Sequence, residues 1–309
     1  DNREIMVTVH VITYCHEKYI RQCLDGILMQ KTNFRFEVLI GDDASKDNTQ
    51  EILKEYDEKY PGFFTMILRK ENIGATNNAY DLFQKAKGKY IAVLEGDDFW
   101  IDPNKLQIQY DFLENHPEFI GCVHDSYWVN EEGNRIEGLN HFLKDTFTLQ
   151  QFDGSHFPAD TITMFFRNIF KNPKHDYSIF YNGHDLLGDA TVMLFLLLQG
   201  DIAYIDRCMG VHRRVVKKNG TNAVSILYHR KYILYEWFKY YRGLEKYAKK
   251  EFGKKIYLPR KEWQFETHIK KIFTEFKNWE SVKYGLIMWF DSGHFFKYTK
   301  IVISLFFKG

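Results

Sequence analysis

Hydrophobic and polar positions follow two alternating periods over the first hundred residues. Short apolar runs rich in β-branched residues predict strands, and each run is followed by a segment with apolar residues at helical spacing. Strands are expected at 5–13, 36–41, 64–69 and 90–94, and helices at 18–29, 49–60 and 74–87. Strand and helix alternate at the spacing of parallel βαβ units, which predicts an α/β fold with a mostly parallel, doubly wound sheet flanked by helices.

The pattern becomes less regular after residue 100. Further elements are expected as a helix at 102–116, strands at 121–130, 202–205 and 209–216, and a helix at 189–199, with an irregular segment over 139–188. From residue 225 onward the spacing is helical, with a break near Leu258-Pro259. We therefore expect an α/β domain over residues 1–224 and a helical region over 225–309.

Charge divides the chain at the same place. Residues 225–309 hold 18 Lys and Arg against 8 Asp and Glu, which leaves 24 against 33 for residues 1–224. The acidic first part argues against nucleic acid as a partner. The basic second part also carries many Trp and Tyr residues, which suits an anionic membrane surface or an acidic partner. The alternative is a packed helical core or an oligomer interface with solvated lysines.

The four cysteines show neither paired zinc spacing nor a dense disulfide framework, so free thiols in a reducing cytosol are expected. No signal peptide is visible, and no apolar run reaches the roughly 18–20 residues of a spanning helix. These features predict a cytoplasmic protein, with peripheral contact at the inner face of the membrane left open.

Three carboxylates, those of Glu95, Asp97 and Asp98, follow the apolar strand at 90–94. Side by side they would raise one another's pKa, and a hard divalent cation keeps all three ionised. Open α/β sheets bind their ligands at the carboxyl ends of strands. The cluster therefore predicts a metal–phosphate site. The alternative is a loop whose acids lead into the helix that begins near Asp102-Pro103.

All four strand ends carry motifs that occur in one order. They are Val11-Ile12-Thr13-Tyr14, Gly41-Asp42-Asp43-Ala44-Ser45, Asn72-Ile73-Gly74-Ala75 and Glu95-Gly96-Asp97-Asp98-Phe99-Trp100. On these motifs the chain resembles the family 2 glycosyltransferases of the GT-A fold over roughly residues 5–215. The resemblance implies an inverting hexosyltransferase that moves a sugar from a nucleotide-sugar, most simply a UDP-sugar, to a hydroxyl group. The implied acceptor is a glycan or a lipid-linked molecule in surface polysaccharide or glycolipid synthesis.

The resemblance also implies a nucleotide site on the first three loops. Thr13 and Tyr14 would contact the uridine, with Glu17 beside it, and Asp43 would accept a hydrogen bond from the base. Asn72 would lie near the nucleotide.

The acidic cluster resembles the D-x-D motif of the family, with Glu95 in its first place. Asp97 would coordinate Mn²⁺ or Mg²⁺ at the diphosphate, and Glu95 would face the ribose or the surroundings of the metal. Asp98 would face the donor sugar or share the metal. Trp100 would stack on the sugar ring, or would instead cover the core.

Direct displacement at the anomeric carbon needs a carboxylate that takes the proton of the acceptor hydroxyl. The segment Gly188-Asp189-Ala190-Thr191 resembles the place where the family has this base, which makes Asp189 the candidate and Asp185 the fallback. The alternative for Asp189 is an acid in a first helical turn, favoured by the helix dipole.

Arg213 corresponds to the arginine that the family often has close to the diphosphate. Val215 stands where a histidine usually follows it. The side chains that could compensate are those of His212, Arg214, Lys217 and Lys218.

Two rival functions remain at this point. A sugar-1-phosphate nucleotidyltransferase also has a nucleotide-binding sheet and carboxylate-held Mg²⁺, but such enzymes open with a glycine-rich loop, and residues 13–17 contain no glycine. A non-catalytic sugar-binding protein of the same fold is the other rival, although Asp97 and Asp189 are both present.

Overall fold

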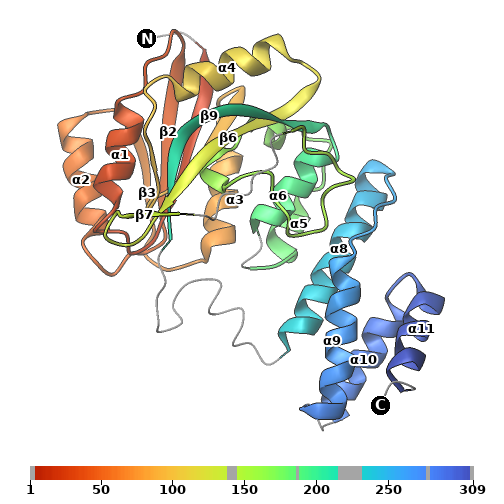
Figure 1. The fold of residues 1–309 in the computed structure, drawn as a ribbon. Coiled ribbons are helices and arrows are strands. Elements are labelled where there is room, and N and C mark those ends of the chain that lie inside the picture. The colour runs from red at the N-terminus through yellow and green to blue at the C-terminus, as the bar shows by residue number, and fades with distance from the viewer. Residues whose placement is uncertain (1–3, 138–144, 186–187, 215–231, 276–278, 307–309) are drawn as a thin grey trace. The chain divides into compact units, whose positions relative to one another are not determined.

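The computed structural model describes residues 4–137, 145–185, 188–214, 232–275 and 279–306. They belong to two compact units (Figure 1). The first comprises Asp1–Gln151 with Phe157–Val216, and the second comprises Phe152–His156 with Lys217–Gly309. The expected domain boundary at residue 224 lies outside the described residues.

The first unit is built on one mixed sheet with the strand order β3-β2-β1-β4-β8-β6-β9-β5, and β7 pairs with β6. The strands are β1 (Ile5–Thr13), β2 (Arg35–Asp42), β3 (Phe64–Leu68), β4 (Tyr90–Glu95), β5 (Phe99–Trp100), β6 (Phe119–Val129), β7 (Arg135–Ile136), β8 (Phe165–Arg167) and β9 (Asp201–Arg213). The first four strands pair in parallel. The expected α/β fold with a mostly parallel sheet is thereby confirmed.

The helices lie on both faces of this sheet (Figure 1). They are α1 (Ile20–Leu28), α2 (Thr49–Lys59), α3 (Ala75–Lys85), α4 (Lys105–Asn115), α5 (Ser178–Asn182) and α6 (Gly188–Leu197), with short 3-10 turns at Thr161–Thr163 and Ile169–Lys171.

Alternation along β1 explains how the helices are divided between the faces, because successive side chains of a strand point to opposite sides. Val7, Val9 and Val11 belong to the core cluster that also contains buried residues of α1, α2 and α4. His10 faces the other way, where its ring stacks on Phe83 of α3 with 4.0 Å between the ring centres.

The second half of the sheet differs from the expectation in two respects. The three residues of β8 form an antiparallel strand between β4 and β6, in a segment that was expected to be irregular. The strands expected at 202–205 and 209–216 are one strand, β9, which continues through exposed residues 206–208 and pairs in parallel with β6. The register between β6 and β9 shifts on both sides of Asp125, so that residues 206 and 207 of β9 have no partner residue on β6.

The second unit is helical, as expected. It contains α8 (Ile233–Phe252), α9 (Arg260–Thr274), α10 (Trp279–Phe290) and α11 (Phe295–Phe306). Its core cluster is formed by Phe238, Phe265, Ile269, Met288 and Tyr298. None of the helices that the structure describes is both long and apolar enough to cross a membrane.

Candidate active site

The parallel register brings three predicted strand ends to one edge of the sheet. Thr13 of β1 lies opposite Asp42 of β2, and Ile12 lies opposite Glu95 of β4. The loops that follow these strands therefore meet, and the site is built from them.

Hydrogen bonds tie the first loop to the second. The Cys15 N–H donates to Ser45 Oγ at 2.8 Å, and the His16 N–H donates to Thr49 Oγ1 at 2.9 Å. The carboxylate of Glu17, predicted to lie beside the uridine, accepts from the backbone and side-chain nitrogens of Asn48 at 3.0 and 2.9 Å. Glu17 thus joins the two loops in this structure.

Asp43 ties the second loop to the third. Its two carboxylate oxygens accept the N–H groups of Ile73 at 2.8 Å and Gly74 at 2.9 Å, and the Asn72 side-chain amide donates to its carbonyl at 3.0 Å. Gly74 has a φ of 86°, which favours glycine at this turn. Each oxygen of Asp43 keeps lone-pair capacity, so the predicted bond from a base is compatible with these contacts.

Thr13 and Tyr14 differ in exposure. Thr13 is buried and its hydroxyl lies 3.2 Å from His16 Nδ1, whereas the side chain of Tyr14 is exposed. A planar base can therefore reach Tyr14 at this surface. The neighbouring Asp42 is fully buried and accepts from Ser45 and Gln50 within its own loop region.

Glu95, Asp98 and His212 form a cluster in which one ligand atom of each lies within 4.8 Å of the others. Asp98 fixes this arrangement, because its Oδ1 accepts the Arg213 N–H at 2.6 Å and its Oδ2 lies 3.1 Å from His212 Nδ1. His212, named from the sequence as one of the cations that could compensate for Val215, thus lies in this cluster as a candidate metal ligand.

The pKa values of the cluster reflect its burial and the coupling of its charges. Burial, together with the charges of Asp98 and Asp97, raises the pKa of Glu95 to about 8. Burial also raises the pKa of Asp98 to about 6, although His212 acts in the opposite direction. Burial alone would lower the pKa of His212, but the hydrogen bond and charge of Asp98 outweigh it and raise that pKa to about 10. A divalent cation bound here would take the place of the protons on Glu95 and His212, and the carboxylate oxygens are donors that suit Mg²⁺ and Mn²⁺.

Asp97, the predicted metal ligand, lies beside this cluster of three but does not belong to it. Its side chain is 23% exposed, and its Oδ2 lies 3.7 Å from His16 Nε2. The structure therefore favours Asp98 as a sharer of the metal, adds His212 to the metal-ligand candidates and leaves the part played by Asp97 a prediction.

Arg213 is not placed to bind a diphosphate as predicted. The residue is 5% exposed, and three of its nitrogens donate to protein acceptors: Nε to the Asp97 carbonyl at 3.0 Å, Nη1 to the Asn130 carbonyl at 3.1 Å and Nη2 to Gln22 Oε1 at 2.8 Å. Its guanidinium instead holds the loop that carries Asp97. Successive side chains of a strand point to opposite faces of the sheet. The side chain of His212 therefore joins Glu95 and Asp98, and the neighbouring side chain of Arg213 points away from them.

Trp100 is not available to a donor sugar. Its side chain is 1% exposed, its Nε1–H donates to the Ile162 carbonyl at 3.1 Å, and Lys105 Nζ lies 3.9 Å from the centre of the ring. The interpretation of Trp100 as a core residue therefore replaces the sugar-stacking one.

Asp189 is the second residue of α6, and its Oδ1 accepts the Ala190 N–H at 2.7 Å. Its carboxylate reaches solvent, yet the surrounding protein atoms raise its pKa by desolvation. The negative charge of Asp189 contributes to the raised pKa of Glu95, which places the two carboxylates in one electrostatic environment. Asp185, the fallback base, has an exposed side chain, and its carbonyl accepts the Thr76 hydroxyl at 2.7 Å.

Comparison with known proteins identifies the class. The family model described as glycosyl transferase family 2 matches residues 8–172, just over half of the chain. The chain belongs to this family.

The individual relatives match over shorter stretches. An uncharacterised protein of Mycobacterium tuberculosis is 47% identical over 122 residues, which cover 40% of this chain and 35% of that protein. The putative teichuronic acid biosynthesis glycosyltransferase TuaG of Bacillus subtilis is 32% identical over 112 residues, covering 36% of this chain and 43% of that protein. The chain thus spans about a third of the length of the first curated relatives that it matches.

Among solved structures, the fold is similar to that of S. aureus TarS 1–349 in complex with UDP-GlcNAc. The TM-score is 0.58 at 18% identity, over 88% of this chain and 73% of that one. A likeness at this identity shows the fold, which is that of a GT-A glycosyltransferase.

Proposed function

We propose that this chain is an inverting glycosyltransferase that moves a sugar from a UDP-sugar to a hydroxyl of a glycan or lipid-linked acceptor, in surface polysaccharide or glycolipid synthesis. The observation that carries the proposal is the cluster of Glu95, Asp98 and His212, with the separate carboxylate of Asp189 in the same electrostatic environment. The similarity to TuaG, named as a putative teichuronic acid biosynthesis glycosyltransferase, and to TarS, whose structure contains UDP-GlcNAc, supports the substrate class.

The donor would bind across the joined loops. Tyr14 would offer an exposed ring to the uracil, and Asp43 would accept a hydrogen bond from the base. Thr13 adjoins Tyr14 in the chain, and Asn72 donates to the Asp43 carbonyl. Glu17 holds the first two loops together through Asn48.

The metal site would consist of Glu95, Asp98 and His212, with Asp97 at its solvent side as a further carboxylate for the metal or the ribose. Mn²⁺ or Mg²⁺ held there would neutralise the charge of the leaving diphosphate. Arg213 would contribute indirectly, because it fixes the backbone of Asp97 and donates its own N–H to Asp98.

Asp189 would accept the proton of the acceptor hydroxyl as that oxygen attacks the anomeric carbon and the bond to the nucleoside diphosphate breaks. A raised pKa makes a carboxylate a stronger base, and desolvation provides this for Asp189. The Ala190 N–H holds Oδ1, which leaves Oδ2 to receive the proton.

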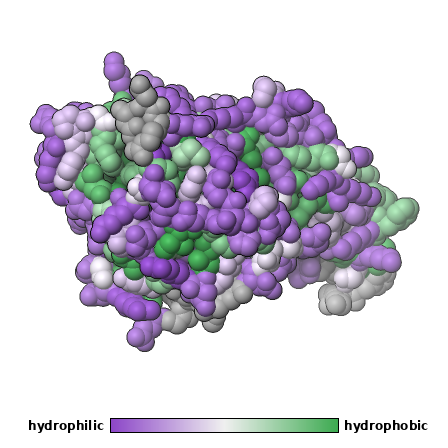
Figure 2. Space-filling view, turned by 90° about the horizontal axis from the view of Figure 1, so that it is seen from above, coloured by the Kyte–Doolittle hydropathy of each residue, from purple (hydrophilic) through white to green (hydrophobic). Residues whose placement is uncertain are grey.

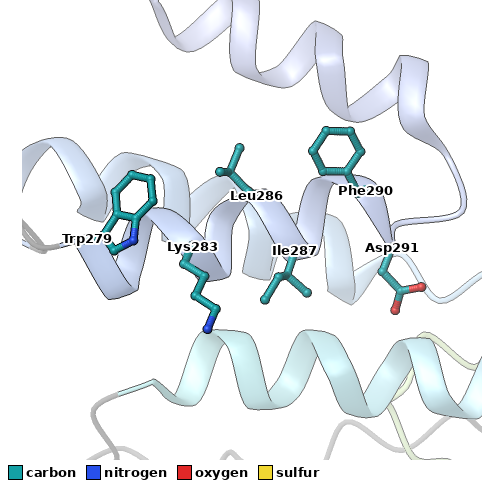
Figure 3. Close-up of a pocket in the computed structure, with 6 residues that line it drawn as sticks. All are labelled: Trp279, Lys283, Leu286, Ile287, Phe290 and Asp291. Carbon is teal, nitrogen blue, oxygen red and sulfur yellow. The ribbon is translucent and has the colours of Figure 1, made fainter.

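We also propose that the helical unit contacts an anionic membrane surface. Trp279, Phe290 and Phe296 are 76%, 69% and 82% exposed, which is uncommon for such large apolar side chains. Figure 3 shows Trp279, Leu286 and Phe290 along one side of α10, with Lys283 pointing to the other. In the hydropathy view of Figure 2, hydrophobic residues form separate patches on a mostly hydrophilic surface. Aromatic residues interleaved with lysines suit the interface of an anionic bilayer.

The membrane proposal has its own test in sedimentation with vesicles. The protein should sediment with vesicles that contain an anionic phospholipid, and a Phe290→Ser/Phe296→Ser variant should bind them less strongly. Equal sedimentation of the two proteins would contradict it.

The transferase proposal is tested by release of nucleotide. The protein should release UDP from a UDP-sugar in the presence of Mn²⁺ and acceptor extract, and GDP- and dTDP-sugars serve as comparison donors. Asp97→Asn and Asp98→Asn separate the two metal-ligand assignments, because the amide removes the charge at nearly constant size. Absence of nucleotide release from every donor would contradict the proposal.

A further inference from the structure

The helical unit contains a half-open basic pocket of about 590 Å³, far along the chain from the residues matched by the family model. It is formed by the second half of α8, the connection from α8 to α9 and the connection from α10 to α11. Its charged and titratable lining consists of Arg242, Glu245, Lys246, Lys249, Lys250, Lys255 and His294. Five permanent cations thus line one depression together with a single carboxylate.

The negative charge of Glu245 is already neutralised by basic side chains of the protein itself. Glu245 accepts hydrogen bonds from Lys261 Nζ at 2.5 Å, from Arg242 Nη1 at 3.1 Å and from the Leu258 N–H at 2.9 Å. Lys261 is fully buried and also donates to the Ser292 carbonyl at 3.2 Å. The floor of the pocket is therefore a closed ion-pair network with no negative charge left for the lysines of the rim.

The rim lysines differ in their partners. Lys246 pairs with Asp291 at 2.7 Å. Lys249 and Lys255 are exposed and make no ion pair with any residue in the described part of the chain. Arg242 is held rigidly, because its Nε donates to the Asp291 carbonyl at 2.6 Å and Gly293 packs against its guanidinium.

A basic last turn often serves to stabilise the carboxyl end of a helix. Here the backbone already does so: the Gly253 N–H donates to the Lys249 carbonyl at 3.1 Å, and the Lys254 N–H donates to the Ala248 carbonyl at 3.2 Å. Lys255 lies beyond the helix altogether. Capping of α8 therefore does not account for the cations of the pocket.

The pKa of His294 is lowered, first by desolvation and then by the charge of Lys261, with Lys297 acting in the same direction. Glu245 and Glu262 oppose this effect without reversing it.

We propose that this pocket binds a phosphate group, with Arg242 as a fixed donor and Lys249 and Lys255 as its mobile cations. Phosphate oxygens match guanidinium and ammonium donors, and a concave site with unpaired lysines gains most from an anion of more than one charge. The phosphate can belong to the headgroup of an anionic phospholipid or to a soluble phosphate ester. The inference does not depend on the transfer reaction or on the apolar side of α10.

The test compares two double variants with equal change in net charge. Lys249→Gln/Lys255→Gln removes two pocket cations, and Lys239→Gln/Lys300→Gln removes two exposed lysines of the same unit that do not line the pocket. The probes are pyrophosphate, measured by calorimetry, and vesicles of phosphatidylcholine with or without phosphatidic acid, measured by sedimentation. Circular dichroism confirms that each variant is folded.

The wild type should bind at least one phosphate probe, and the pocket variant should bind it at least about tenfold more weakly while the control variant stays within about twofold. Binding of pyrophosphate in solution would identify a soluble ester as sufficient, and binding only to phosphatidic acid vesicles would identify the headgroup. The proposal is overturned if the two variants lose affinity equally, or if the wild type binds none of the probes. UDP release by the pocket variant reports separately on the transferase proposal.

Discussion

Asp98 Oδ2 lies 3.1 Å from His212 Nδ1, while the other oxygen of Asp98 accepts the backbone N–H of Arg213 at 2.6 Å. One buried carboxylate thus joins the turn between β4 and β5 to the end of β9 and raises the pKa of the imidazole. A cation that uses His212 as a ligand must first displace a proton from it, because only the neutral imidazole binds metal.

This relationship predicts that metal binding releases protons. In the metal-free protein the pKa of Glu95 is about 8 and that of His212 about 10, so both carry a proton at neutral pH. Mn²⁺ binding at neutral pH should therefore release about one to two protons. Calorimetry in buffers of different ionisation enthalpy measures this number, and a buffer-independent binding enthalpy would contradict the proposed ligand set.

The assignment of the base predicts opposite results at two nearby acids. Asp189→Asn should lower kcat by about 10²- to 10⁴-fold and leave the donor dissociation constant unchanged, because the amide cannot take the acceptor proton. Asn keeps an oxygen for the Ala190 N–H, so the start of α6 should persist. Asp185→Asn is the matched control and should change kcat by only a few-fold. A kcat of Asp189→Asn close to that of the wild type would show that another residue is the catalytic base.

Trp100 is predicted to matter for stability and not for the donor. Trp100→Phe keeps an aromatic ring in the core but removes the donor to the Ile162 carbonyl. The free energy of unfolding should fall by about 1–3 kcal/mol, measured by denaturant titration, while the donor KM stays unchanged. An increase in donor KM without loss of stability would restore the sugar-stacking role.

Lys105 makes stability depend on pH. The residue is fully buried, its Nζ has no hydrogen-bond partner among the described residues, and burial lowers its pKa to about 7. The unfolded chain keeps this proton up to about pH 10.4, so it binds more protons than the folded protein between pH 7 and that value. The contribution of Lys105 to stability therefore rises with pH across this window and is most unfavourable below pH 7.

Lys105→Met is the corresponding variant, since it fills similar space without a charge. It should be more stable than the wild type below pH 7, by at least about 1 kcal/mol. The difference should shrink as the pH rises toward 10. Denaturant titrations across this range measure it, and a difference that is constant with pH would show that Lys105 does not titrate as inferred.

The first half of the sheet could be predicted because each strand is a continuous apolar run bounded by a helix. β8 could not, since three residues carry no period and the strand forms only by pairing with β4 and β6. β9 was divided in two because Asp206, Arg207 and Cys208 interrupt its apolar pattern, and sequence alone does not show that such residues stay in a strand when exposed.

The candidate site, like the sheet, could be predicted from the sequence only in part. The acidic strand end was evident from its motif, whereas the choice between His212 and Arg213 depends on which side of β9 faces the cluster. Trp100 was ambiguous because an aromatic residue beside an acidic loop serves equally well as core or as sugar contact, and only burial decides.

We propose that Glu95, Asp98 and His212 hold the metal through which the chain binds a uridine diphosphate group. The most direct measurement is a calorimetric titration of UDP into the full chain with Mn²⁺ and with EDTA, for the wild type and for Asp98→Asn. Both EDTA and the substitution should weaken UDP binding by at least about tenfold, which corresponds to about 1.4 kcal/mol. Equal affinity of the wild type for UDP in Mn²⁺ and in EDTA would contradict it.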